Sequence, residues 1–220
     1  MPTAVYTYIL LAAIVVVALT QMAAGLGPSI ESAGFDKQLF LHGQYWRILT
    51  GAAIHGGIIH IAMNGFALFN VGRIFEMLTN RAHLAVVFLL SAIGGGVLSL
   101  LFLPDGVSVG ASGGIVGLIG YLAVYSFRRR QFVSSAFRKN LIFNIGFLFV
   151  FGIALSGVVD NYGHLGGLIV GAVYGFAQIP SDPTVDPREA GSTARAFGFV
   201  AMAIYLATCV LSILLITRTI

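Results

Sequence analysis

Seven long apolar segments dominate the chain and decide what it can fold into. A helix that crosses a bilayer needs about 20 apolar residues, within a range of roughly 17–25. Such segments lie near residues 4–24, 48–70, 83–103, 111–127, 140–157, 162–179 and 197–216. We expect all seven to be helices, because a backbone exposed to lipid must satisfy its hydrogen bonds within the segment. The sequence therefore predicts an all-α, multi-pass integral membrane protein.

The composition excludes an ordinary water-soluble domain. Charged residues make up 9% of the 220 positions and hydrophobic residues 58%, whereas soluble domains carry about 25% charged residues. The single cysteine, Cys209, lies in an apolar segment and is expected to be a small core residue. One cysteine cannot form an internal disulfide or a thiolate metal cluster.

The positions of lysine and arginine predict the orientation in the membrane. If the N-terminus is cytoplasmic, the outer side holds only Lys37, Arg47 and Arg218. The inner loops then hold Arg73, Arg81, Arg128, Arg129, Arg130, Arg138, Lys139, Arg188 and Arg195. Cytoplasmic loops normally carry this excess. The net charge of +4 thus reflects membrane orientation and contact with lipid. We expect no nucleic-acid partner.

Two stretches are not spans and divide the chain. Residues 25–47 form an outer loop whose aromatic side chains suit the membrane interface. Residues 181–196 form a polar, proline-containing cytoplasmic linker. We therefore expect a six-span core over 1–180, the linker, and a seventh transmembrane helix with a short tail over 197–220.

A few polar residues occur where polarity is costly, inside the apolar segments. His55, His60 and Asn64 fall in the second segment, Ser112 opens the fourth, and His164 opens the sixth. An ionisable residue at membrane depth indicates a functional site by default. The alternatives are that Ser112 only packs between helices and that each histidine only bonds a neighbouring helix.

Helix lengths place Ser112 and His164 at similar depths. Ser112 lies 16 residues from Arg128, and His164 lies 14 residues from Gln178. At 1.5 Å per residue these distances are about 24 and 21 Å, whereas the hydrocarbon core is about 30 Å thick. Both residues should therefore lie below the outer surface, at the ends of short helices, around a water-accessible cavity.

Glycine spacing predicts that these two helices pack closely. The relevant glycines are Gly163, Gly167, Gly171 and Gly175 in the sixth segment and Gly113 and Gly117 in the fourth. Faces with a small residue at every fourth position let helix backbones approach each other. We infer that Ser112 and His164 can come within hydrogen-bonding reach. Close packing without chemistry is the alternative.

These residue types suit acyl transfer. A serine hydroxyl needs a base, usually a neutral histidine, and the helix start at Ser112 offers free N–H groups for an oxyanion. His60 and Asn64 are spaced i, i+4 on one helix face, where both can donate hydrogen bonds. No acidic residue falls inside a segment to orient His164. We therefore expect a serine–histidine dyad.

Several motifs resemble those of rhomboid proteases, in the family's order and over roughly residues 1–180. Gly110-Ala111-Ser112-Gly113 matches G-x-S-G. His164, Gly167 and Gly171 match H-x-x-G-x-x-x-G, and His55, His60 and Asn64 match H-x-x-x-x-H-x-x-x-N. Trp46-Arg47 resembles the family's W-R, and Gly72 with Glu76 its G-x-x-x-E. Val116 departs from the pattern, since many relatives carry an aromatic residue there that stacks on the histidine.

The resemblance implies a six-helix rhomboid core, with a seventh helix added, that hydrolyses peptide bonds within the membrane and uses no metal or cofactor. Ser112 would attack, His164 would act as base and then acid, and Ser112 N–H, His60 and Asn64 would bind the oxyanion. The implied substrates are single-span transmembrane proteins whose helix is weakened near the outer face. The active site would open to the outer side. The compact core suits a prokaryotic plasma membrane, with an organelle membrane as the alternative.

Two other functions stay open. A catalytically silent rhomboid-like protein would bind membrane clients, although such relatives generally lack the serine or the histidine. A small transporter or channel would place its polar groups near the midplane, often with a buried carboxylate. The sequence shows polar groups near one face and no intramembrane acid, which favours the peptidase.

Overall fold

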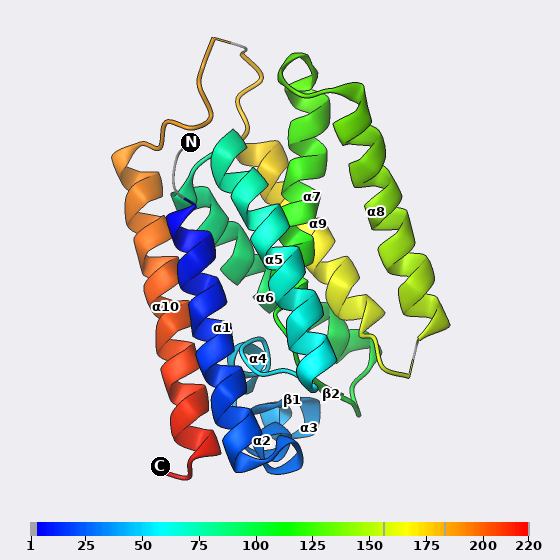
Figure 1. The fold of residues 1–220 in the computed structure, drawn as a ribbon, viewed down its shortest axis with the longest axis vertical. Coiled ribbons are helices and arrows are strands. Elements are labelled where there is room, and N and C mark those ends of the chain that lie inside the picture. The colour runs from blue at the N-terminus through cyan, green and yellow to red at the C-terminus, as the bar shows by residue number, and fades with distance from the viewer. Residues whose placement is uncertain (1–3, 156, 183, 220) are drawn as a thin grey trace.

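A computed structural model describes residues 4–155, 157–182 and 184–219. Within these ranges, seven helices have 17 or more residues (Figure 1). They are α1 Val5–Ala24, α5 Ile58–Leu78, α6 Arg81–Phe102, α7 Ser112–Arg128, α8 Ser135–Ala154, α9 Asn161–Gln178 and α10 Ser192–Ile216. Residues 1–3, 156, 183 and 220 belong to the predicted core, linker and tail but lie outside the described residues.

The helices confirm the predicted all-α membrane fold. Helices α1, α5, α6, α8 and α10 are each long and apolar enough to cross a membrane. Helix α7 has 17 residues, and the polar residues at the ends of α9 and its glycines lower the mean hydropathy of that helix. The number of spans therefore stays a prediction.

Short elements gather at one end of the bundle and form a cap (Figure 1). This cap consists of α2 Leu26–Ala33, β1 Phe35–Asp36, α3 Lys37–Leu41, α4 Arg47–Thr50 and β2 Val107–Ser108. The two strands pair antiparallel, with Phe35 opposite Ser108. The segment predicted as an outer loop is therefore folded, and it joins the chain that precedes α7.

The predicted second span is wrong in its boundaries. It was expected over residues 48–70, but α5 covers Ile58–Leu78, and a turn region separates it from α4. Gly57, at the start of α5, has φ of 122°, a conformation that glycine adopts readily and that breaks a helix. His55 therefore precedes the helix instead of lying within it.

Six basic residues predicted in inner loops lie in helices instead: Arg73 in α5, Arg81 in α6, Arg128 in α7, Arg138 and Lys139 in α8, and Arg195 in α10. The reason is that these helices extend beyond their apolar stretches. Long basic side chains can extend from a helix end to reach the aqueous boundary. The orientation in the membrane stays a prediction.

Helix α10 packs against the other helices instead of standing apart. Tyr205 is buried, its ring meets Phe88 at 5.0 Å between centroids, and its hydroxyl donates to the Ala52 carbonyl at 3.1 Å. The linker before α10 is also held, because the buried Arg129 guanidinium donates to the carbonyls of Pro180, Asp182 and Val185. Through the Tyr205 hydroxyl, α10 therefore contacts the segment between α4 and α5.

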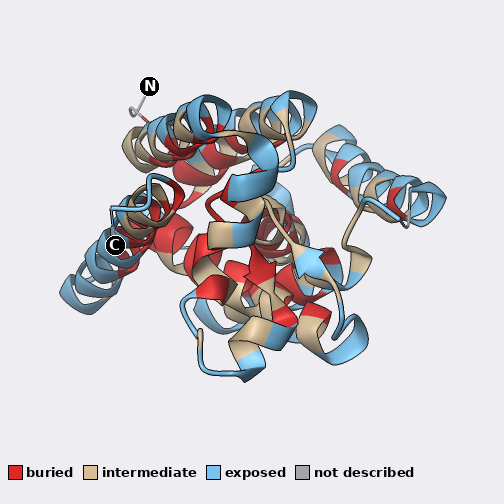
Figure 2. Ribbon diagram, turned by 90° about the horizontal axis from the view of Figure 1, so that it is seen from below, coloured by how far each residue is buried: buried red, intermediate tan, exposed pale blue. Residues whose placement is uncertain are grey.

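The centre of the bundle is built from α6, α7 and α9, whose backbones lie against each other at glycines. A β-carbon on Gly167 or Gly171 would overlap the backbone of Gly113 or Gly117 on α7. On another face of α9, a β-carbon on Gly166 would lie 2.5 Å from the Gly94 carbonyl of α6. Figure 2 shows the buried positions concentrated toward the middle of the bundle.

We predict that Gly171→Ala destabilises the protein, because the new methyl would meet the rigid Gly117 carbonyl. Overpacking a core typically costs about 1–3 kcal/mol. Gly146→Ala on α8 is the matched control, since a β-carbon there meets nothing within 4 Å. Thermal unfolding in detergent should show a lower midpoint for Gly171→Ala only. Equal midpoints for both variants would contradict this close packing.

Candidate active site

Ser112 is the first residue of α7, at the wall of the cavity beneath the cap. The first N–H groups of a helix have no intrahelical partner, so those at the start of α7 can bind a ligand. The preceding turn is set by Gly110, whose φ is 119° and whose N–H donates to the Gly51 carbonyl at 2.8 Å. This turn aligns the helix start with the chain between α4 and α5.

His60 and Asn64 lie beside the turn that leads to Ser112. A β-carbon on Gly110 would lie 2.7 Å from His60 Nε2 and 3.8 Å from Asn64 Nδ2. Gly56 N–H donates to His60 Nδ1 at 3.2 Å, which leaves Nε2 as the protonated nitrogen. Asn64 Nδ2 donates to the His60 carbonyl at 3.1 Å. Two donor groups from one face of α5 thus lie beside Gly110, two residues before Ser112.

His164 lies in the first turn of α9, where its backbone N–H donates to the Asp160 carbonyl at 3.0 Å. The imidazole is buried, and within the described residues its Nδ1 has no hydrogen-bond partner. The backbones beside the two predicted catalytic residues adjoin, since a β-carbon on Gly113 would lie 3.6 Å from the Gly163 carbonyl. The described residues include no hydrogen bond from Ser112 to His164. The dyad itself stays a prediction.

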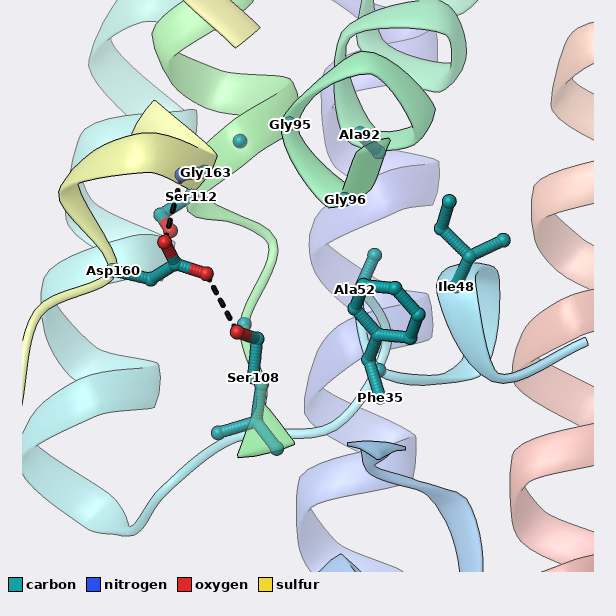
Figure 3. Close-up of a pocket in the computed structure, with 14 residues that line it drawn as sticks. Phe35, Ile48, Ala52, Ala92, Gly95, Gly96, Ser108, Ser112, Asp160 and Gly163 are labelled. Carbon is teal, nitrogen blue, oxygen red and sulfur yellow. Dashed lines mark hydrogen bonds between the residues drawn. The ribbon is translucent and has the colours of Figure 1, made fainter. Parts of the chain in front are cut away.

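A cavity of about 50 Å³ lies where these helix ends meet (Figure 3). Ser112, Gly113, Gly163 and Asp160 line it on one side, and Phe35 and Ile48 on another. One buried water needs roughly 10–15 Å³ of such space, so the cavity can hold a few water molecules. Ser108, Ser112 and Asp160 supply its polar side chains, whereas His60, Asn64 and His164 are not among the residues that line it.

His55 supports His60 from behind. Its ring is buried and meets the His60 ring at 5.2 Å between centroids, edge to face. Its backbone is held by a reciprocal pair of bonds with Gln21, in which Nε2 donates to the His55 carbonyl and Oε1 accepts from its N–H. Gln21 carries no signal in the sequence, because its partner is a backbone 34 positions along the chain.

The remaining motif residues hold the scaffold. Arg47 is buried and donates to the carbonyls of Glu31 and Gly34, which ties the cap together, while Trp46 beside it is exposed. Glu76 accepts from the backbone and hydroxyl of Thr7 and joins α1 to α5. The structure does not bring these three motif residues to Ser112.

Within the described part of the chain, no aromatic side chain takes the place that Val116 leaves without a ring. Val116 is buried one turn after Ser112, and no ring among the described residues pairs with the His164 imidazole. Support for His164 comes from the glycine contacts and from the start of α9. There Asp160, which sequence analysis did not single out, accepts from Gly163 N–H at 2.8 Å. Its place as a helix-capping aspartate four residues before His164 was the available signal.

Comparison with known proteins identifies the family. The family model described as a Rhomboid domain matches residues 42–181. RHOMBOID-like protein 6, mitochondrial, of Arabidopsis thaliana is 36% identical over 160 residues, which cover 69% of this chain and 51% of that protein. Rhomboid protease GluP of Bacillus subtilis is 36% identical over 136 residues, which cover 62% of this chain and 26% of that protein. Inactive rhomboid protein 1 of Papio anubis is 32% identical over 139 residues, which cover 62% of this chain and 16% of that protein. The chain thus spans about half or less of these relatives.

We predict that Gly110→Ala impairs the site because a methyl would collide with His60 and strain a positive φ. Gly43→Ala is the matched control, since Gly43 has φ of 103° but open space around it. Labelling of Ser112 by a fluorophosphonate, measured on folded protein, should be slowed by Gly110→Ala about 100-fold and little changed by Gly43→Ala. Similar labelling rates in both variants would contradict the contact between Gly110 and His60.

Proposed function

The chain belongs to the rhomboid family, and on this premise we propose that it is an intramembrane serine endopeptidase with a Ser112–His164 dyad. One observation carries the proposal. Ser112 and His164 lie at the starts of two helices whose backbones adjoin at glycines, beside a cavity with room for water. The sequence relatives include a protein named as a protease.

The dyad would cleave a peptide bond in two steps. His164 would accept the Ser112 hydroxyl proton as the oxygen attacks the peptide carbonyl. The same proton would then pass to the departing amine, leaving an acyl group on Ser112. A water molecule from the cavity would attack that ester, with His164 again as base, and release the acid. Burial of the His164 side chain suits a neutral imidazole, because an unpaired buried charge is costly.

The oxyanion would be held by groups converging from two helices. The Ser112 N–H at the start of α7 points along the positive end of the helix dipole. His60 Nε2, beside Gly110, and the Asn64 amide add two donors. Removing one such donor typically costs about 100- to 1000-fold in rate. His60 and Asn64 are therefore proposed as part of the catalytic machinery.

The substrate is proposed to be a single-span transmembrane protein that enters sideways from the lipid. A helix hides its peptide bonds, so the segment must unwind before cleavage. Helix α8 stands at the edge of the bundle and buries only Leu141 and Gly152 (Figure 1). Its exposed Phe143 and Phe147 stack at 6.4 Å between centroids. Because α8 buries so few side chains, we propose that the substrate enters between α8 and the rest of the bundle.

The proposed topology has a cytoplasmic N-terminus and an active site open to the outside. The cap, Ser112 and the start of α9 lie at the end opposite the linker and its basic neighbours. The linker then separates a six-span core over 1–180 from a seventh span over 197–220. The excess of basic residues at the linker end supports this orientation.

Client binding without cleavage is the second candidate. It is favoured by the similarity to a relative named as inactive and by the missing hydrogen bond from Ser112 to His164 within the described chain. In that case the protein would bind a transmembrane client without cleaving it. Both catalytic residue types are nevertheless present at the motif positions.

We predict that a fluorophosphonate labels the wild type and that a transmembrane substrate is cleaved in liposomes. Ser112→Ala should abolish labelling and cleavage, and His164→Ala should lower both by about 1000-fold or more, because the nucleophile loses its base. Ser126→Ala is a matched control, since Ser126 lies on the same helix and donates to the Ala123 carbonyl. A folded wild type that neither labels nor cleaves would favour client binding.

A further inference from the structure

We propose that Asp160 is a positioning residue, whose carboxylate fixes the segment before Ser112 against the helix that carries His164. The inference rests on the proposed peptidase function and adds a residue to it. Asp160 lies outside the predicted spans and the matched motifs, yet it lines the same cavity as Ser112.

The Asp160 carboxylate accepts hydrogen bonds from three elements, and Figure 3 draws two of these bonds, from Gly163 and from Ser108. Oδ1 accepts from Gly163 N–H at 2.8 Å and caps the start of α9. Oδ2 accepts from the hydroxyls of Ser99 on α6 and Ser108 on β2, each at 2.5 Å. Short bonds to a charged acceptor are among the stronger hydrogen bonds in proteins. One side chain thus joins α6, α9 and the strand that leads to α7.

The spacing along the chain makes this junction relevant to catalysis. Ser108 lies four residues before Ser112, and Asp160 lies four residues before His164. The first interval contains the turn at Gly110, and the second is one helical turn. Because both intervals are short and structured, the carboxylate constrains how the two predicted catalytic side chains face each other.

The network extends to the cap through Lys37. This lysine is 1% exposed, and its Nζ donates to Ser108 Oγ at 2.6 Å, so Ser108 bridges the ammonium and the Asp160 carboxylate. Burial lowers the pKa of Lys37, while the negative charges of Asp160 and Asp36 act to raise it. Removing Asp160 would leave a buried cation without its main compensating charge.

A capping role alone is the competing explanation, and the two make different predictions. Asparagine caps helices about as well as aspartate, so Asp160→Asn should preserve the start of α9. The same substitution would remove the negative charge that faces Lys37. It would also replace Oδ2, the atom that accepts from the Ser99 and Ser108 hydroxyls. A loss of reactivity in this variant would therefore report positioning and not helix capping.

The test measures the rate constant for fluorophosphonate labelling of Ser112, kcat and KM for a transmembrane substrate, and thermal unfolding. A misplacement of 1 Å can cost about 100-fold. We expect Asp160→Ala and Asp160→Asn to lower labelling and kcat by about 10- to 100-fold, with KM nearly unchanged. Asp160→Asn should keep a near wild-type unfolding midpoint. Adding Lys37→Met to Asp160→Asn should restore part of the rate, since it removes the uncompensated cation.

Ser134→Ala is the control for capping, because Ser134 caps α8 through Phe137 N–H and lies outside the site. It should leave labelling unchanged. Wild-type labelling and kcat in folded Asp160→Asn would overturn the positioning role and leave Asp160 as a cap. A wild type that does not label at all would instead overturn the proposed peptidase function, and the role of Asp160 with it.

Discussion

The contact between the backbones of α7 and α9 is the constraint on which the rest of the structure depends. With no side chains between them, the two helices meet at Gly113 and Gly117 on one side and at Gly167 and Gly171 on the other. Packing in a membrane gains little from the hydrophobic effect, so close van der Waals contact must supply the attraction. That contact places the starts of both helices beside one another.

At the capped end of the bundle, the surrounding chain orients the side chains that this packing brings together. Glycine contacts bring two helix starts together but do not orient the side chains on them. Orientation comes from the surrounding chain: the turn at Gly110 against His60, the Gln21 pair that holds His55, and the cap held by Arg47. A polar site within an apolar bundle thus depends on a small folded cap that shields it.

The fold was largely predictable because apolar length and glycine spacing are local properties of the sequence. The second span was misplaced because residues 48–55 are apolar yet form α4 and a turn, and hydropathy does not distinguish buried turns from helices. The pairing of Phe35 with Ser108 was not predictable, since two-residue strands have no periodicity. The resemblance predicted His60 and Asn64 as oxyanion donors, but the contact of His60 with Gly110 and the bonds of Gln21 and Asp160 depend on tertiary structure.

The hydroxyl of Tyr205 on the last helix bonds the Ala52 carbonyl, three residues before His55. That single bond spans 153 positions of the chain and joins α10 to the segment that leads into α5, the helix that carries His60 and Asn64. Helix α10 is therefore packed into the bundle and supports it. A displacement of α10 would therefore reach the chain just before His55 through a directional hydrogen bond as well as through packing.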